Sequence, residues 1–147
     1  MSEAGAGQAL FEFVRHWSRR WNGTADAERV TRGRDVLAVE VVNTLAHRGE
    51  PTVNGVAVEL GLDQSNASRL LAHAADAGYL TLGRSVADQR RRIVTLTGSG
   101  HQLLAAAHAW QDEVYGVLTA DWTEEERVAF GQAMRRLIAK SPALDGL

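Results

Sequence analysis

The first apolar residues of the chain follow the period of a helix. Four of them lie three or four positions apart and would share one helix face: Leu10, Val14, Trp17 and Trp21. The Asn22-Gly23 pair ends the pattern, so we expect this helix over residues 5–22. Residues 24–32 are polar and ambiguous, and a short helical turn is one structure that they allow.

The next stretch predicts two helices with short breaks between them. A helix is expected over about residues 33–47, because apolar and polar positions alternate at helical spacing until Gly49-Glu50-Pro51 breaks it. Thr52 can cap a short helix that runs to Leu60. Gly61 then supplies the tight turn that helix-turn-helix connections often require.

A further helix, expected over about residues 64–77, has two unlike faces. At about 100° per residue, its small and apolar residues fall on one side: Ala67, Leu70, Leu71 and Ala74. The other side carries hydrogen-bonding groups: Ser65, Asn66, Ser68, Arg69, His73 and Asp76. Gly78 ends the helix in a C-cap role. One face is therefore suited to packing and the other to recognition.

A β-hairpin and two more helices complete the pattern. The β-type runs 79–82 and 93–96 flank a charged loop of about ten residues, which indicates a long, exposed hairpin. A long helix starts at Thr97. A capping box, Thr123-Glu124-Glu125-Glu126, opens the last helix, which ends at Ser141-Pro142. The order predicts a mainly α fold with a small β-hairpin wing: a winged helix-turn-helix flanked by N- and C-terminal helices.

The charge is unevenly distributed along the chain. The 147 residues carry a net charge of −2, which taken alone argues against a nucleic-acid partner. Residues 64–100, however, hold five arginines against two aspartates, a net charge of +3. Because the local field acts on phosphates, this segment is where we expect contact with DNA.

Several other functions are disfavoured by composition and motifs. There is no cysteine, which excludes disulfides, thiolate metal sites and thiol redox sensing. No run approaches the roughly 18 apolar residues that span a membrane, and no secretory signal is evident, so we expect a cytoplasmic protein. A nucleophile elbow and a phosphate-binding loop are both missing, so we expect neither an enzyme nor a cofactor. His101 and His108 lie two turns apart, but no third ligand completes a metal site.

With these elements in place, the chain resembles the MarR family of bacterial winged-helix transcription regulators over nearly its whole length. The resemblance is carried by Thr52-Val53-Asn54, Leu60-Gly61-Leu62, Gln64-Ser65-Asn66-Ala67-Ser68-Arg69-Leu70, Asp88-x-Arg90 and Val94-Thr95-Leu96-Thr97-x-x-Gly100. These stretches match the helix-turn-helix, the wing and its exit into the long helix. The family often has arginine where Gln89 and Leu82 stand here.

The resemblance implies a DNA-binding surface built from the second helix of the motif and the wing. That recognition helix would enter the major groove, where Arg69 can bond a guanine edge and Asn66 an adenine. Arg90 is the leading candidate for the minor groove, oriented by Asp88. The expected DNA contacts are Thr52, Asn54, Ser65, Asn66, Ser68, Arg69, His73, Arg84, Asp88, Arg90, Arg91 and Arg92.

The resemblance also implies a homodimer that binds palindromic double-stranded DNA. Within one domain over residues 1–147, residues 33–100 would form the DNA-binding lobe, and residues 5–22 with 100–141 the dimerisation lobe. Such regulators commonly act as repressors that a small, often phenolic, effector releases from DNA. The residues available to line an effector cleft are His16, Trp17, Trp21, His47 and Trp110, although a core role explains the tryptophan stripe better.

Two other interpretations stay open. The winged helix can belong to another regulator, such as a metal sensor of the ArsR family, which the missing cysteines and the long terminal helices disfavour. It can also serve as a protein-interaction adapter, which the arginine-tipped wing and the polar helix face disfavour. A steep salt dependence of binding would favour DNA, because phosphate contacts release counterions.

Overall fold

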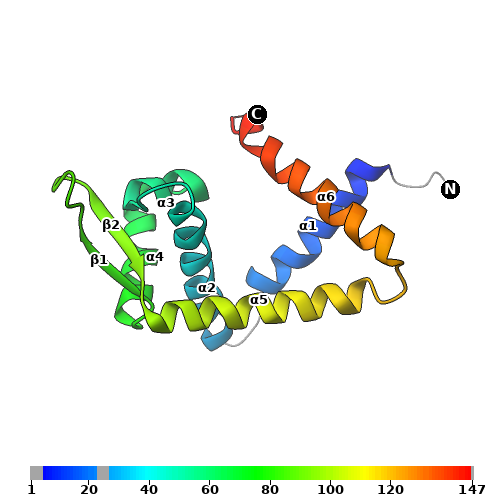
Figure 1. Ribbon diagram of the computed structural model, residues 1–147, viewed down its shortest axis with the longest axis horizontal. Coiled ribbons are helices and arrows are strands. Elements are labelled where there is room, and N and C mark those ends of the chain that lie inside the picture. The colour runs from blue at the N-terminus through cyan, green and yellow to red at the C-terminus, as the bar shows by residue number, and fades with distance from the viewer. Residues whose placement is uncertain (1–4, 23–26, 147) are drawn as a thin grey trace. The chain divides into compact units, whose positions relative to one another are not determined.

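The computed structural model describes the backbone of residues 5–22 and 27–146 and the side chains of residues 5–18 and 31–146. Its helices are α1 (Ala6–Asn22), α2 (Ala27–Ala46), α3 (Val53–Leu60), α4 (Gln64–Asp76), α5 (Gly98–Leu118), α6 (Glu124–Lys140) and the short 3₁₀ helix η1 (Ser141–Leu144) (Figure 1). Strands β1 (Leu80–Arg84) and β2 (Arg92–Leu96) form an antiparallel pair. The mainly α fold with a β-hairpin wing is confirmed.

The chain divides into two compact units, residues 1–107 and 108–147. The first unit contains α1 to α4, the hairpin and the start of α5. We call the part from α2 to the start of α5 the winged-helix lobe, and residues 108–147 the C-terminal unit. No helix in the described ranges is both long and apolar enough to cross a membrane.

Helix α2 begins earlier than the sequence pattern predicts. It starts at Ala27, so the predicted start near residue 33 is wrong, and residues 27–32 belong to α2 itself and not to a separate turn. Residues 24–26 lie outside the described residues. The six residues before Gly33 include no proline or glycine, so nothing in them interrupts a helix. The sequence of these residues has no apolar period, so the pattern gave no sign of the helix.

The caps and turns around α3 and α4 form as predicted. Thr52 caps α3, and its hydroxyl accepts the backbone N–H of Gly55 at 2.9 Å. Gly61 follows α3 with φ 63°, and Gly78 follows α4 with φ 91°. Other residues rarely adopt these left-handed conformations, which end each helix and redirect the chain.

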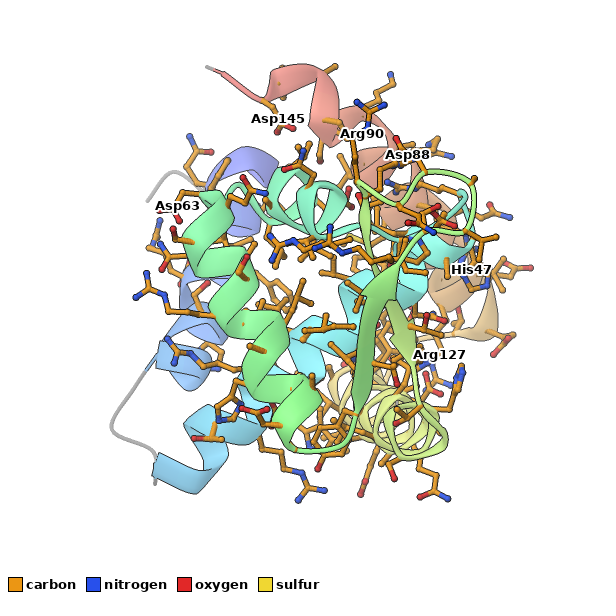
Figure 2. All side chains as sticks on the ribbon, turned by 90° about the vertical axis from the view of Figure 1, so that its left-hand side faces the viewer. His47, Asp63, Asp88, Arg90, Arg127 and Asp145 are labelled. Carbon is orange, nitrogen blue, oxygen red and sulfur yellow. The ribbon has the colours of Figure 1, made fainter. Side chains whose placement is uncertain are left out.

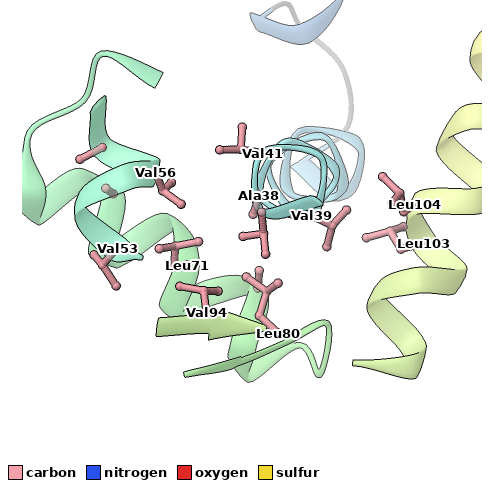
Figure 3. Close-up of a cluster of buried hydrophobic side chains, with 14 residues drawn as sticks. Ala38, Val39, Val41, Val53, Val56, Leu71, Leu80, Val94, Leu103 and Leu104 are labelled. Carbon is pink, nitrogen blue, oxygen red and sulfur yellow. The ribbon is translucent and has the colours of Figure 1, made fainter. Parts of the chain in front are cut away.

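The core of the winged-helix lobe lies where α2, α3, α4, the hairpin and the start of α5 meet (Figure 3). Its buried side chains are Ala38, Val39, Val41, Val42, Val53, Val56, Ala57, Ala67, Leu71, Ala74, Leu80, Val94, Leu103 and Leu104. In Figure 3, Leu103 and Leu104 extend from α5 towards Val39 on α2. The inward faces predicted for α3 and α4 are confirmed, with Leu60 and Leu70 half-buried beside them.

A close contact that only glycine permits joins the wing to α5. The Thr97 hydroxyl donates to the carbonyl of Gly78 at 2.6 Å and accepts the N–H of Gly100 at 3.0 Å. A Cβ atom at Gly100 would overlap the carbonyl oxygen of Tyr79. The Thr97-x-x-Gly100 motif therefore fixes the start of α5 against the end of α4.

The C-terminal unit, taken by itself, is held by polar contacts and aromatic rings. The predicted capping box is confirmed, because Glu126 N–H donates to Thr123 at 3.1 Å and Thr123 N–H donates to Glu126 at 2.9 Å. The Arg127 guanidinium donates to the carbonyl of Thr119 through two nitrogens, at 3.2 and 2.8 Å. Three rings pack between its helices: Tyr115, Trp122 and Phe130. None of its described apolar side chains is buried.

Candidate nucleic-acid interface

Helix α4 turns its polar face to solvent because its other face is packed in the core. Ala67, Leu71 and Ala74 have no exposed surface. Asp63 begins the helix, and its carboxylate accepts the backbone N–H of Asn66 at 2.7 Å. The Asp63 cap was not predicted from the sequence, although an aspartate just before a helical pattern is a usual sign of an N-cap.

Three polar residues at the start of α4 are hydrogen-bonded in series. The Asn66 side-chain amide donates to the Asp63 carboxylate at 2.9 Å, and the Arg69 guanidinium donates to the Asn66 side-chain oxygen at 2.9 Å. The two residues expected to read bases are therefore bonded to each other in the free protein. Asp63 lies at the N-terminal end of α4 and adds a negative charge there (Figure 2). Base contacts would have to replace these bonds.

The wing tip is folded around a buried serine. Ser85 donates its backbone N–H to the carbonyl of Arg91 at 3.0 Å, and its hydroxyl accepts the N–H of Asp88 at 3.3 Å. The Asp88 carboxylate accepts the N–H of Arg90 at 3.0 Å and lies 3.5 Å from its Nε. The Arg90 side chain is 94% exposed, so Asp88 orients a side chain that extends into solvent at the tip (Figure 2).

The base of the wing is linked to α4 through Arg92. The strand register places Arg92 directly opposite Arg84, so the two side chains share one face of the hairpin. Arg92 Nη2 donates to Ser68 Oγ on α4 at 3.3 Å, and Arg84 Nη1 donates to the carbonyl of Gln89 at 3.3 Å. Like charges directly opposite each other disfavour strand pairing, so an anion bound near this pair would stabilise the hairpin.

Two adjoining hollows lie between the wing and the starts of α3 and α4. The smaller, of about 220 Å³, is lined by Thr52, Val53, Asn54, Gln64, Arg90, Arg91 and Arg92. The larger and more open, of about 610 Å³, is lined by Gln64, Ser65, Ser68, Arg69 and Arg92. Gln64 and Arg92 border both, so the hollows form one continuous basic surface. Gln64, at the first position of α4, was not among the expected DNA contacts.

Most of the residues predicted to contact DNA line this surface. Three others are next to it: Asn66 is hydrogen-bonded to Arg69, Asp88 is hydrogen-bonded to Arg90, and Arg84 lies opposite Arg92 in the hairpin. His73 has a different neighbour. Its Nδ1 lies 2.9 Å from Oδ1 of Asp35 on α2, and His73 does not line either hollow. Within the described residues, no three His, Cys, Asp or Glu side chains are grouped as metal ligands are.

Solved structures share the fold of this chain. A crystal structure of MarR superposes with a TM-score of 0.71 at 19% identity, covering 99% of this chain and 97% of that one. The Staphylococcus aureus MepR–DNA complex has a TM-score of 0.55 at 20% identity, covering 90% and 98%. The PcaV transcriptional regulator from Streptomyces coelicolor, in complex with its natural ligand, has a TM-score of 0.58 at 19% identity, covering 97% and 99%.

The sequence itself matches a family model over most of the basic surface, although the match ends just before Arg92. No curated protein sequence matches the chain significantly. Residues 33–91 match the model of the MarR family, a range that includes α3, α4, β1 and the wing tip. Residues 33–91, less than half of the 147-residue chain, are therefore similar to the MarR family, and the solved structures share the fold of nearly the whole chain.

Proposed function

We propose that this protein is a transcription regulator of the MarR type, a repressor that binds double-stranded DNA at a specific sequence. The observation that carries the proposal is the continuous surface on which Arg69 of α4 and Arg90 to Arg92 of the wing border two adjoining hollows. A helix fits the major groove, which is about 12 Å wide, while arginine is attracted to the minor groove. The MepR complex, in which a protein of this fold holds DNA, supports the same use of the fold here.

Each part of the surface has a role that follows from its position. Asn66 and Arg69, one turn into α4, would exchange their mutual hydrogen bond for bonds to base edges. Arg90 at the exposed tip would enter the minor groove. Thr52 and Asn54 at the start of α3 face the same hollow as the wing arginines, where they would bind backbone phosphates.

We further propose a homodimer that presents two such surfaces to a palindrome, with half-sites about 34–36 Å apart. The C-terminal unit supports this, because many of its large apolar side chains are exposed, among them Val117, Leu118, Val128, Phe130, Leu137 and Ile138. Helix α1 also exposes Leu10, Phe11, Phe13 and Val14. Apolar surface of this kind marks an interaction site, and a second copy of the chain is the partner that a palindrome requires.

Release from DNA by a small aromatic effector is the last part of the proposal. PcaV, which shares the fold, was solved with its natural ligand. Of the expected cleft residues, His16 and Trp17 lie with ring centroids 5.5 Å apart, and the side chain of Trp21 lies outside the described residues. Tryptophan fluorescence, titrated with a panel of phenolic acids in the presence of DNA, tests this part. A flat response across the panel would count against it.

The decisive experiment is an anisotropy titration with DNA that flanks the protein's own gene, with scrambled competitor and at two salt concentrations. We expect binding by two protomers per palindrome that scrambled DNA does not displace. The affinity should fall steeply with salt, because each neutralised phosphate contributes about 0.9 to the logarithmic slope. Sequence-blind binding would contradict the proposal. An affinity that does not change with salt concentration would favour a protein partner instead.

A further inference from the structure

Asp35 is the one ionisable side chain that is buried among the described residues. It lies on α2 with 5% of its surface exposed. Its Oδ1 is 2.9 Å from Nδ1 of His73, which lies 38 positions further along the chain on α4 and has a side chain that is 53% exposed. A buried carboxylate is costly unless it is paired and hydrogen-bonded. The pair therefore joins α2 to the recognition helix at one fixed point.

The apolar face of α4 consists mostly of small side chains. Ala67, Leu71 and Ala74 are buried, and Leu70 and Ala75 are half-buried beside them. Apolar burial is not directional, whereas a hydrogen bond between ionisable groups restrains both distance and angle. The contact between Asp35 and His73 therefore adds a directional restraint to these apolar contacts.

We propose that Asp35 is a positioning residue that acts through His73 to set the rotation of α4 and so to aim Asn66 and Arg69 at the bases. A helix with its side chains is about 10–12 Å wide, so a rotation of roughly 20° displaces its outer groups by roughly 2 Å. That displacement breaks a hydrogen bond to a base edge. The inference rests on the proposed DNA binding and gives a role to two residues outside the hollows.

The test uses His73→Ala, which removes the donor, and His73→Gln, which keeps one. His101→Ala, at an exposed histidine on α5, is the matched control. We expect His73→Ala to raise the Kd for specific DNA about tenfold, or about 1.4 kcal/mol. The Kd for scrambled DNA and the salt slope should not change, because no phosphate contact is lost. His73→Gln should recover most of the affinity, and His101→Ala should match the wild type.

A different pattern would overturn the inference. If His73 touches a phosphate directly, His73→Ala lowers the salt slope by about 0.9 and weakens specific and scrambled DNA alike. The double variant Asp35→Ala/His73→Ala should bind no more weakly than His73→Ala, because the two residues act as one unit. Additive losses would show that they act separately. All titrations are run at a temperature where circular dichroism shows each variant folded.

Amide hydrogen exchange provides a readout that does not need DNA. We expect His73→Ala to accelerate exchange in α4 and to leave α3 unchanged, because the restraint on one helix is released. Equal exchange in the wild type and the variant would overturn the positioning role. If the wild type fails to bind specific DNA, the proposed function fails, while the exchange of α4 still decides the role of Asp35.

Discussion

The winged-helix lobe and the C-terminal unit differ in where their apolar side chains lie. In the lobe, four helices and both strands contribute buried residues to one core. In the C-terminal unit, large apolar side chains are turned to solvent, and Val117 and Ile138 are 74% and 63% exposed. Its capping box and its aromatic contacts each contribute only about 1 kcal/mol. The lobe is therefore stabilised by its own packing, whereas the described residues of the C-terminal unit have no buried apolar side chains of their own and, in the proposed dimer, would pack against a partner.

In the proposed function, this difference separates two tasks along the chain. The lobe would hold its recognition surface in one geometry, because base recognition fails when side chains move by an ångström or two. The C-terminal unit would instead keep its apolar surface available for association. The stability of the lobe should be independent of protein concentration, while that of the C-terminal unit should rise with it.

Replacing a leucine by alanine should destabilise the lobe far more than the C-terminal unit, and this is the largest difference that we expect between the two regions. Leu71 has no exposed surface, so Leu71→Ala should destabilise the lobe by about 2–5 kcal/mol through lost burial and a cavity. Leu137 is 47% exposed, so Leu137→Ala should cost less than about 1 kcal/mol below the dimer dissociation constant. Urea unfolding followed by circular dichroism at low protein concentration measures both. Equal losses would abolish the distinction between the regions.

A charge on α6 should break assembly and leave the lobe folded. Ile138→Glu would place a carboxylate in the proposed dimer contact, and we expect it to weaken the dimer by about 3 kcal/mol, more than a hundredfold in Kd. Sedimentation measures the dimer, and the melting of the lobe should not change. Gln132→Glu, at an exposed polar position of the same helix, is the control. If both variants dimerise equally, the interface lies elsewhere.

The fold could be predicted where local sequence decides the structure. The caps at Thr52, Gly61 and Gly78 depend on residues a few positions away, and all three form as expected. The start of α2 at Ala27 could not be found in this way, because its first turns carry no apolar period to reveal a helix. Local chemistry is thus sufficient for turns and for helices with a packed face.

The sequence predicted which residues belong to the candidate site better than it predicted which of them contact one another. Helical periodicity correctly placed Asn66 and Arg69 on the exposed face of α4. The contacts of Arg92 with Ser68 and of His73 with Asp35 span 24 and 38 positions, so they depend on how α4 packs against the wing and α2. The sequence contains no pattern that predicts such pairs, so the contact of His73 with Asp35 could not be foreseen.

The wing arginines distinguish the winged-helix lobe from the C-terminal unit by function, because replacing them should weaken DNA binding without affecting assembly. Arg90→Ala should weaken binding to all sequences by about 1–3 kcal/mol. Arg92→Ala should cost at least as much, because Arg92 borders both hollows and bonds to Ser68. Each should lower the salt slope by about 1. Arg136→Ala, at an exposed arginine of the C-terminal unit, should change neither quantity. Unchanged affinity of Arg90→Ala at moderate salt would refute its assignment.

The smallest effect should come from the acidic cap of the recognition helix. Asp63→Ser keeps an N-cap hydroxyl but removes the carboxylate that binds the Asn66 side chain. We expect DNA affinity to rise severalfold, by roughly 0.5–1 kcal/mol, and more at low salt because screening is weaker. Asp63→Ala, which also loses the cap, should cost about 1 kcal/mol of stability. Weaker binding by Asp63→Ser would mean that Asp63 holds the Asn66 side chain in the orientation that binds its base. The hydrogen bonds that join Asp63, Asn66 and Arg69 would then prepare α4 for DNA, and they would not compete with the bonds to the bases.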